Sequence, residues 1–371
     1  MYEPEGGAAA FRLAALVRVL ESNGYNTTVL TSQVPDRVPS TRAVRRWPVL
    51  RDRSGAVRGY LQYASFDIPL FFRLMFARRP DIVVVEPPPT TGVVCRIVCR
   101  IRRIPYAYFS ADVASTAAAG IGAPAPVVAV LRRVESWVLR GARIVFAVSD
   151  DVAREVVALG ARRNRVTMVG TGIDTEVFNP GEATGRAEHP SFVYAGTMSE
   201  IQGAGVFVEA FARTAERWPD ARLVMLGGGV EHDDLVRQVE ASGDTRVEFH
   251  GTVGGDEVAE RLRAATAGLA SVRPGRGYDF AYATKALASI ACGTPVIYAG
   301  VGPVAQQVMA NALGWAVEWD VDQVANAMET ALEHEHTASE RRRLADWALD
   351  HASLRHVGQL AVDAIEAART R

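Results

Sequence analysis

The sequence predicts an α/β protein of two domains, each with a parallel sheet covered by helices. Its 371 residues exceed one ordinary core and suit about two domains of roughly 150–200 residues. Short apolar strands alternate with amphipathic helices, which is typical of parallel sheets. The segment 179–190 is rich in Pro, Gly and Glu and lacks periodicity, so we expect the linker there. The predicted domains are 1–180 and 181–350, followed by a helix at 351–371 that could pack back on the first domain.

Composition indicates a folded protein outside the membrane. Hydrophobic residues make up 49% and charged residues 22%, which argues against extended disorder. No apolar run reaches the roughly 18 residues that cross a bilayer, and no signal peptide opens the chain. Cys95 and Cys99 lie four apart on a predicted helix and Cys292 stands alone, a pattern set by packing more often than by metal. We therefore expect a cytoplasmic protein in a reducing compartment, with no metal and no nucleic-acid partner.

Charge is unevenly distributed along the chain. Residues 1–185 carry 24 basic and 16 acidic side chains, a net charge of +8, whereas residues 186–371 carry 17 and 26, a net charge of −9. The first half is therefore the one expected to meet an anionic partner. Seven arginines between Arg37 and Arg58 contribute most, and a solvated loop explains them better than a binding patch.

The first domain begins with the Gly6-Gly7 loop and an amphipathic helix that ends near 23–24, followed by a strand at 27–31. No strand precedes the helix, although a parallel domain normally opens with one. Either the true start lies upstream or this domain lacks its first strand.

The arginine-rich segment is expected to be irregular, and a helix at 66–76 follows it. Core packing is the favoured interpretation of that helix, and a membrane-interface surface flanked by arginines is the alternative. The alternation then continues with strands at 81–86, 106–110, 143–148 and 166–169 and helices at 92–103, 127–139 and 150–159. Asp112 and Ser149 fall just past strand ends, where open α/β sheets place ligands.

The second domain repeats this Rossmann-like alternation. Its strands are expected at 191–195, 222–226, 247–249, 268–272 and 296–298, and its helices at 204–217, 233–241, 256–265, 304–310 and 321–333. No Gly-x-Gly-x-x-Gly follows a strand, and Gly227-Gly228-Gly229 suits a turn better than a dinucleotide site.

The stretch 278–295 carries the main chemical signal. The chain has forty arginines and a single lysine, Lys285. A lysine offers a compact charge that suits a phosphate in a tight pocket, although a chance survivor of a codon bias is the alternative. Thr284 is expected to cap a helix that Gly293 and Pro295 close. Lys285 would then lie beside free backbone amides at the positive end of a helix dipole, which together make an anion site.

Five motifs in order resemble retaining glycosyltransferases of the GT-B fold, family 4. They are EGGA at 5–8, VGTGIDTEVFNP at 169–180, YAGT at 194–197, VEFHGTV at 247–253, and ATK at 283–285 continuing to ACGTPVI at 291–297. The resemblance covers essentially the whole chain. It implies two Rossmann-like domains that face each other across a cleft, with a nucleotide-diphosphate sugar of UDP or GDP type held mainly by the second.

The resemblance also implies roles for particular residues. Lys285 would neutralise the leaving diphosphate, and Asp112 could orient an acceptor hydroxyl, although a helix-capping role for Asp112 is equally compatible. No cofactor or metal is implied. The expected donor-binding residues are Gly6, Gly7, Gly196, Thr197, Gln202, His250, Thr252, Val253, Thr284, Lys285 and Leu287. The expected acceptor-binding residues are Asp112, Ser149 and Thr171.

Two departures from the family pattern concern the donor site. Many relatives carry a Glu-x7-Glu pair whose second member contacts the ribose, whereas this chain has Phe280 and Ala288 there. The loop that commonly carries a phosphate-binding Arg or Lys reads SEIQG at 199–203. The donor could be unusual, the ribose could be bound by backbone or by Ser289, or activity could be lost.

The favoured function is a metal-independent, retaining glycosyl transfer to a small-molecule, thiol or lipid-linked acceptor, in antibiotic or cell-envelope biosynthesis. The positive first domain would allow peripheral contact with the inner face of the membrane. A sugar-nucleotide epimerase of similar fold and a degenerate nucleotide-sugar-binding subunit are the alternatives.

Overall fold

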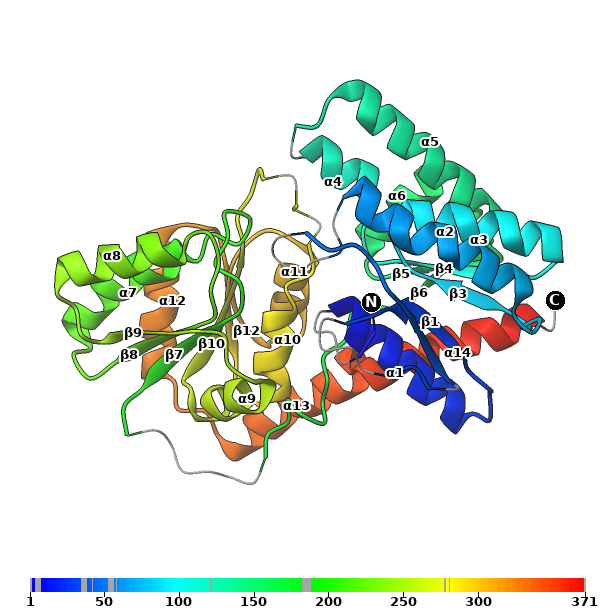
Figure 1. The fold of residues 1–371 in the computed structure, drawn as a ribbon. Helices are drawn as coiled ribbons and strands as arrows, with labels where there is room; N and C mark the ends of the chain where they lie inside the picture. Colours follow the sequence, from blue (N-terminus) through cyan, green and yellow to red (C-terminus); the bar gives the residue numbers. More distant parts are fainter. Residues whose placement is uncertain are drawn as a thin grey trace. The chain divides into compact units, whose positions relative to one another are not determined.

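The protein is described from a computed structural model (Figure 1). The structure describes residues 2–3, 8–34, 39–41, 43–52, 57, 59–120, 122–181, 188–276, 278–279 and 281–369. Gly6, Gly7, Phe280 and half of the predicted linker, residues 182–187, therefore lie outside the described residues. The chain forms two compact units: unit 1 comprises Met1–Gly170 with Leu354–Arg371, and unit 2 comprises Thr171–Ser353. The first border lies ten residues before the position 180/181 that the sequence suggested.

Unit 1 contains a four-stranded parallel sheet in the order β3-β4-β5-β6. Its strands are β3 (Val83–Val85), β4 (Tyr106–Ser110), β5 (Ile144–Ala147) and β6 (Val166–Met168), connected by α3 (Pro89–Arg102), α4 (Ala114–Gly120), α5 (Ala125–Gly141) and α6 (Asp150–Ala158). The β4 and β5 strands are buried at every position, as expected for apolar strands covered on both faces. Phe109 and Phe146 pack together in this core. The prediction of these strands is confirmed within a few residues, and α4 starts where the alternative capping role of Asp112 placed a helix.

The first strands form a separate two-stranded sheet. Here β1 (Val29–Ser32) pairs in parallel with β2 (Val44–Trp47), after α1 (Ala8–Ser22) and before α2 (Tyr60–Phe76). The expectation that the arginine-rich segment is irregular was wrong for β2. Val44 and Arg46 of β2 are half-buried, whereas Arg45 and Trp47 are exposed. This alternation is typical of a strand with one face in solvent, where arginines are tolerated.

The last helix belongs to unit 1. Helix α14 (Leu354–Arg369) packs along α1, and both can be followed in Figure 1. Gly358 permits the close approach, because a Cβ there would lie 2.9 Å from Cγ2 of Val19. Val357, Val362 and Ile365 complete the core of the unit. The chain therefore leaves unit 1 and returns to it.

Unit 2 has one six-stranded parallel sheet in the order β12-β11-β10-β7-β8-β9. The strands are β7 (Ser191–Ala195), β8 (Arg222–Leu226), β9 (Val247–His250), β10 (Ala267–Val272), β11 (Val296–Gly300) and β12 (Gly314–Val317). The helices are α7 (Gly205–Arg217), α8 (His232–Ser242), α9 (Gly255–Ala264), α10 (Thr284–Ala291), α11 (Pro303–Ala310), α12 (Val321–Glu333) and α13 (Ala338–Ala352). The prediction missed β12 and α13. The strand order reverses between β7 and β10, which is where open α/β sheets place a ligand.

Two further expectations can be compared with the described residues. Among them, no helix is both long enough and apolar enough to cross a bilayer. Cys95, Cys99 and Cys292 are free and buried, which confirms that they form no disulfide framework.

Candidate functional site

Unit 2 contains a pocket of about 410 Å³ at the carboxyl end of its sheet. The pocket is formed by the loops after β7, β8 and β9 and by the start of α10, beside the point where strand order reverses. It is lined by Ile173, Phe178, Val193, Ala195, Gly196, Thr197, Gln202, Leu226, Gly227, Thr252, Val253, Val258, Leu262, Leu269, Thr284, Lys285 and Ala288. Lys285 carries the only ionisable side chain in that set.

Glycines allow the backbone to close around this lysine. Gly196 has a φ of 140°, and a Cβ there would lie 2.4 Å from Cε of Lys285. Gly227 has a φ of 122°, and its Cβ would lie 2.4 Å from the carbonyl oxygen of Gly196. Both backbone conformations are rarely adopted by other residues, and both contacts exclude a side chain. The lysine stem therefore packs directly against the loop after β7.

The Lys285 ammonium has neutral partners. It donates a hydrogen bond to Oε1 of Gln202 and lies 5.2 Å from the centre of the Tyr194 ring. The hydroxyl of Tyr194 lies 2.8 Å from the same Gln202 oxygen, which fixes the amide. Within the described residues, no carboxylate pairs with Lys285. Burial lowers the pKa of Lys285 to about 8, because a desolvated ammonium is less stable.

Helix α10 directs its first turn into the pocket. Thr284 is the first residue of the helix, and the N-cap is Ala283 without a side-chain cap, so the prediction that Thr284 caps the helix was wrong. The first-turn amides beside Lys285 therefore have no side-chain acceptor from the cap. Gly293, with a φ of 72°, follows the end of the helix as expected.

The pocket wall around Ala288 is apolar. Ala288 packs in one cluster with Ile173, Phe178 and Val253. Ser289 is 1% exposed, and its hydroxyl donates to the carbonyl oxygens of Thr294 and Pro295. Ser289 therefore faces the interior, which removes one of the groups considered for ribose binding. No carboxylate lies on this wall among the described residues that line it.

Seven of the expected donor residues line the pocket, and two described ones do not. The seven are Gly196, Thr197, Gln202, Thr252, Val253, Thr284 and Lys285. The ring of His250 is turned to Glu248, at 3.2 Å, while its backbone carbonyl accepts from the amide of Gly227. Leu287 is fully buried and is not among the residues that line the pocket. The sequence did not point to the apolar residues Ile173, Phe178 and Val258, since apolar positions carry no chemical signal of their own.

The expected acceptor residues lie past strand ends: Asp112 follows β4, Ser149 follows β5 and Thr171 follows β6. Ser149 is the N-cap of α6, and its hydroxyl accepts from the amide of Val152. Thr171 is buried and begins unit 2, whereas Asp112 and Ser149 belong to unit 1. The amides of Ala114 and Ser115 donate to the carboxylate of Glu135, at 2.7 and 3.1 Å, so Asp112 is not the cap of α4.

A charged cluster surrounds Asp112 that sequence reasoning missed. Arg12 on α1 and Glu86, just after β3, form an ion pair of 2.8 Å in which both side chains are 7% exposed. Asp112 has an exposed side chain, yet desolvation by the surrounding protein raises the pKa of its carboxyl and the Arg12 guanidinium counteracts this. The sequence did contain one signal for this cluster: Glu86 follows an apolar strand, and open α/β sheets place ligand-binding residues at such positions.

Sequence comparison assigns both halves of the chain. Residues 7–172 match the family described as "Glycosyl transferase 4-like domain". Residues 189–334 match the family described as "Glycosyl transferases group 1". The chain thus contains two glycosyltransferase-family domains. A D-inositol 3-phosphate glycosyltransferase of Kribbella flavida is 31% identical over 215 residues, which are 52% of this chain and 49% of the relative. The chain spans about half the length of the curated relatives it matches.

Solved structures show that the chain has the GT-B fold of glycosyltransferases. Sucrose-phosphate synthase of Thermosynechococcus elongatus has a TM-score of 0.75 at 16% identity, covering 98% of this chain and 94% of that one. HepE of Anabaena, in complex with UDP and glucose, has a TM-score of 0.71 at 16% identity, covering 99% and 98%. At such identities the likeness shows the fold, and the fold class predicted from the sequence is confirmed.

The packing of Lys285 on Gly196 can be tested with alanine substitutions. We expect Gly196→Ala to weaken the binding of UDP, used as an anionic probe, by roughly tenfold or more, because the new Cβ displaces the lysine stem. Gly228→Ala is the matched control in the neighbouring loop, since a Cβ there has nothing within 4 Å. Calorimetric titration should leave the control within about twofold of wild type. Equal losses in both variants would contradict the proposed role of Gly196.

Proposed function

We propose that this protein is a retaining glycosyltransferase that takes a sugar from a nucleoside diphosphate of UDP or GDP type. The observation that carries the proposal is the pocket of unit 2, in which Lys285 is the only ionisable side chain among the lining residues. An ammonium without an anionic partner favours an anionic ligand, and the start of α10 adds backbone donors for a phosphate. The glycosyltransferase-family domains supply the reaction class.

Lys285 would act on the leaving group. Cleavage of the bond between the sugar and the diphosphate places additional negative charge on the departing phosphate. A preorganised cation and helix N-terminus stabilise that charge more in the transition state than in the bound donor, which lowers the barrier. No residue that lines the pocket is a carboxylate, so the ligand set offers no site for a metal ion bound through acids.

The nucleoside would lie along the apolar wall around Ala288. Ile173, Phe178 and Val253 can contact a base or the faces of a ribose, while Thr252 offers a hydroxyl. Without a carboxylate at position 288, the ribose hydroxyls would be bound by backbone groups or remain hydrated. The HepE complex supports UDP as the first nucleotide to test.

The acceptor would carry a hydroxyl group that the acids of unit 1 orient. Asp112 keeps an exposed carboxylate that takes no hydrogen bond from the described residues, and Arg12 and Glu86 stand beside it. A positioned carboxylate can accept the proton of an attacking hydroxyl. The names of the curated relatives make D-inositol 3-phosphate one acceptor to include.

A donor and acceptor panel tests this function. The protein is incubated with UDP-, GDP- and dTDP-sugars, with and without polyol, inositol phosphate, thiol and lipid-linked acceptors, and free nucleotide and sugar products are followed. We expect nucleotide release that depends on an acceptor, and a product whose anomeric configuration matches that of the donor. Epimerised sugar without an acceptor would instead assign an epimerase, and binding without turnover across the panel would assign a binding subunit.

Substitution of Lys285 separates its charge from its shape. Lys285→Met should lower the turnover number by roughly 100-fold or more, the magnitude typical of losing one transition-state charge stabiliser. Lys285→Arg should also lose affinity, because the planar guanidinium does not fit the space against Gly196. If the arginine variant keeps donor affinity within about twofold, a lysine is not required there.

Donor affinity should depend on pH through Lys285. Its pKa of about 8 leaves the free side chain mostly charged at pH 7 and about 3% charged at pH 9.5. A bound diphosphate favours the charged form, so UDP affinity should fall by up to about 30-fold between these pH values. Calorimetry on wild type and on Lys285→Met measures this, and the variant should show a flat profile over the same range. A flat profile in wild type would contradict the assignment.

We also propose that unit 1 contacts an anionic membrane surface. One face of α2 packs in the core through Leu70 and Leu74, which supports the favoured interpretation of this helix. The other face exposes Ile68, Phe72 and Phe76 at 63%, 55% and 81%, four residues apart along the helix. Arg78 and Arg79 lie exposed at its end, which suits acidic lipid headgroups.

Vesicle sedimentation tests the α2 surface. We expect binding to vesicles that contain acidic phospholipid and little binding to neutral vesicles. The double variant Phe72→Ser, Phe76→Ser should lose most of this binding, because two exposed apolar anchors are removed. The double variant Val230→Ser, Met309→Ser, which changes exposed apolar residues of unit 2, should bind as wild type. Equal loss in both would refute a specific role for α2.

A further inference from the structure

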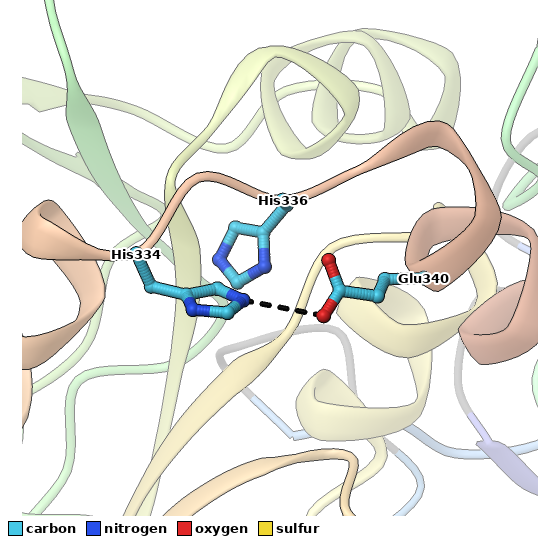
Figure 2. Close-up of side chains that lie close together, drawn as sticks. All are labelled: His334, His336 and Glu340. Atoms are coloured by element: carbon cyan, nitrogen blue, oxygen red, sulfur yellow. Dashed lines mark hydrogen bonds and ion pairs between the residues drawn. The ribbon is translucent and has the colours of Figure 1, made fainter.

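The loop between α12 and α13 brings two histidines and a glutamate together (Figure 2). His334 follows the end of α12, His336 lies two residues later, and Glu340 is in the first turn of α13. One potential ligand atom from each of the three lies within 4.8 Å of the others. This cluster belongs to unit 2 but shares no residue with the pocket around Lys285.

The three side chains converge on one small space. Nε2 of His334 lies 3.3 Å from Oε1 of Glu340, and the rings of His334 and His336 have their centres 4.6 Å apart. Figure 2 shows both rings and the carboxylate directed toward one another. A tetrahedral ion with bonds of about 2.0–2.1 Å holds neighbouring ligand atoms roughly 3.4 Å apart. The His334–Glu340 separation already has about this length, and the His336 ligand atom lies within 4.8 Å of both.

The side chain of Glu340 is oriented by its own helix. Its Oε2 accepts from the backbone amide of Thr337 at 2.8 Å, while the Thr337 hydroxyl accepts from the Glu340 amide, which is a capping box. Oε1 is the oxygen that faces His334. The cap and a metal bond would therefore use different oxygens of one group.

The ring of His336 is oriented from the sheet side. Trp315 on β12 meets it edge to face, with centres 6.1 Å apart. The two helices that flank the loop are also fixed, since α12 packs on α7 and α13 packs on α10. The three groups are therefore presented by supported backbone on both sides, which limits the cost of bringing them together.

We propose that His334, His336 and Glu340 bind a divalent transition-metal ion of the zinc type. Two imidazole nitrogens and one carboxylate oxygen form a mixed donor set that suits Zn²⁺, Co²⁺ or Ni²⁺, whereas Mg²⁺ and Ca²⁺ select oxygen ligands. Water completes the coordination, because His334 and Glu340 are 47% and 39% exposed. The ion links the end of α12 to the start of α13 and so stabilises unit 2. Neither the glycosyltransferase-family match nor the proposed transfer reaction assigns this site.

Metal titration of the untagged full chain tests the site. After chelator treatment and dialysis, the protein is titrated with Zn²⁺ by calorimetry and with Co²⁺ by visible absorption. We expect one ion per chain, a Co²⁺ spectrum of a four-coordinate site with nitrogen ligands, and a melting temperature raised by about 5 °C at saturating Zn²⁺. Mg²⁺ should produce no shift. Absence of binding at protein concentrations of about 50 μM would overturn the proposal.

Matched variants separate the metal site from the helix cap. Glu340→Gln keeps the capping box, because glutamine can make the same backbone hydrogen bond, but removes the anionic ligand. His336→Ala removes an imidazole without touching the cap. Each should weaken Zn²⁺ binding by about 100-fold or more, because losing a ligand costs at least as much as losing a hydrogen-bond partner of a ligand. The melting temperature of the metal-free protein should be nearly unchanged. His351→Ala on the same α13, whose ring stacks on Trp347, should bind as wild type. Unchanged Zn²⁺ affinity in Glu340→Gln and His336→Ala would show that the metal binds elsewhere.

Discussion

The pocket of unit 2 is built around a half-buried ammonium that pairs with no carboxylate of the described residues. Lys285 is placed by α10 and packed on the backbone of Gly196, and no other residue that lines the pocket has an ionisable side chain. Desolvation makes the charged form of Lys285 less stable, which lowers its pKa. Glycines at the ends of β7 and β8 allow the approach, and the reversal of strand order leaves the space. Lys285 and the first-turn amides of α10 are the groups that would bind a diphosphate.

Two acids of unit 1, Glu86 and Glu135, have partners. Arg12 and Glu86 neutralise one another, and the guanidinium of Arg12 also lies 4.8 Å from the centre of the Phe109 ring. Glu135 is satisfied by the two backbone amides at the start of α4. Such pairing limits the cost of burial and fixes the geometry at the sheet edge. These paired groups of unit 1 have fixed positions, whereas Lys285 of unit 2 has no carboxylate partner among the described residues.

Much of this could be predicted from the sequence, and the misses have physical causes. Strands that are buried on both faces, such as β4 and β7, were located because their apolar runs are unbroken. The strand β2 was missed because its arginines lie on a half-exposed sheet, and β12 because it is half-buried at every position. Lys285 was found because it is unique in the chain. Arg12 and Glu86 are 74 residues apart, and only the folded chain brings them together.

The histidine cluster was missed for a different reason. The sequence search for metal ligands began from the cysteines, and no zinc-like spacing surrounds them. His334 and His336 are adjacent in a loop that the sequence marked only as the end of a helix. Their convergence with Glu340 depends on where α13 begins, and α13 was not predicted. The prediction of Ala288 as an unusual position stays a prediction, and the structure adds that an apolar wall surrounds it.

The return of α14 to unit 1 has a consequence for synthesis on the ribosome. Unit 2 is one continuous segment, whereas the core of unit 1 needs Val357, Val362 and Ile365 from the last helix. Domains usually fold in the order in which they emerge. Here the second unit can close its core while the first, although translated earlier, still lacks a helix. Unit 1 therefore cannot complete this core until α14, a 16-residue helix that follows unit 2 in the chain, has been synthesised.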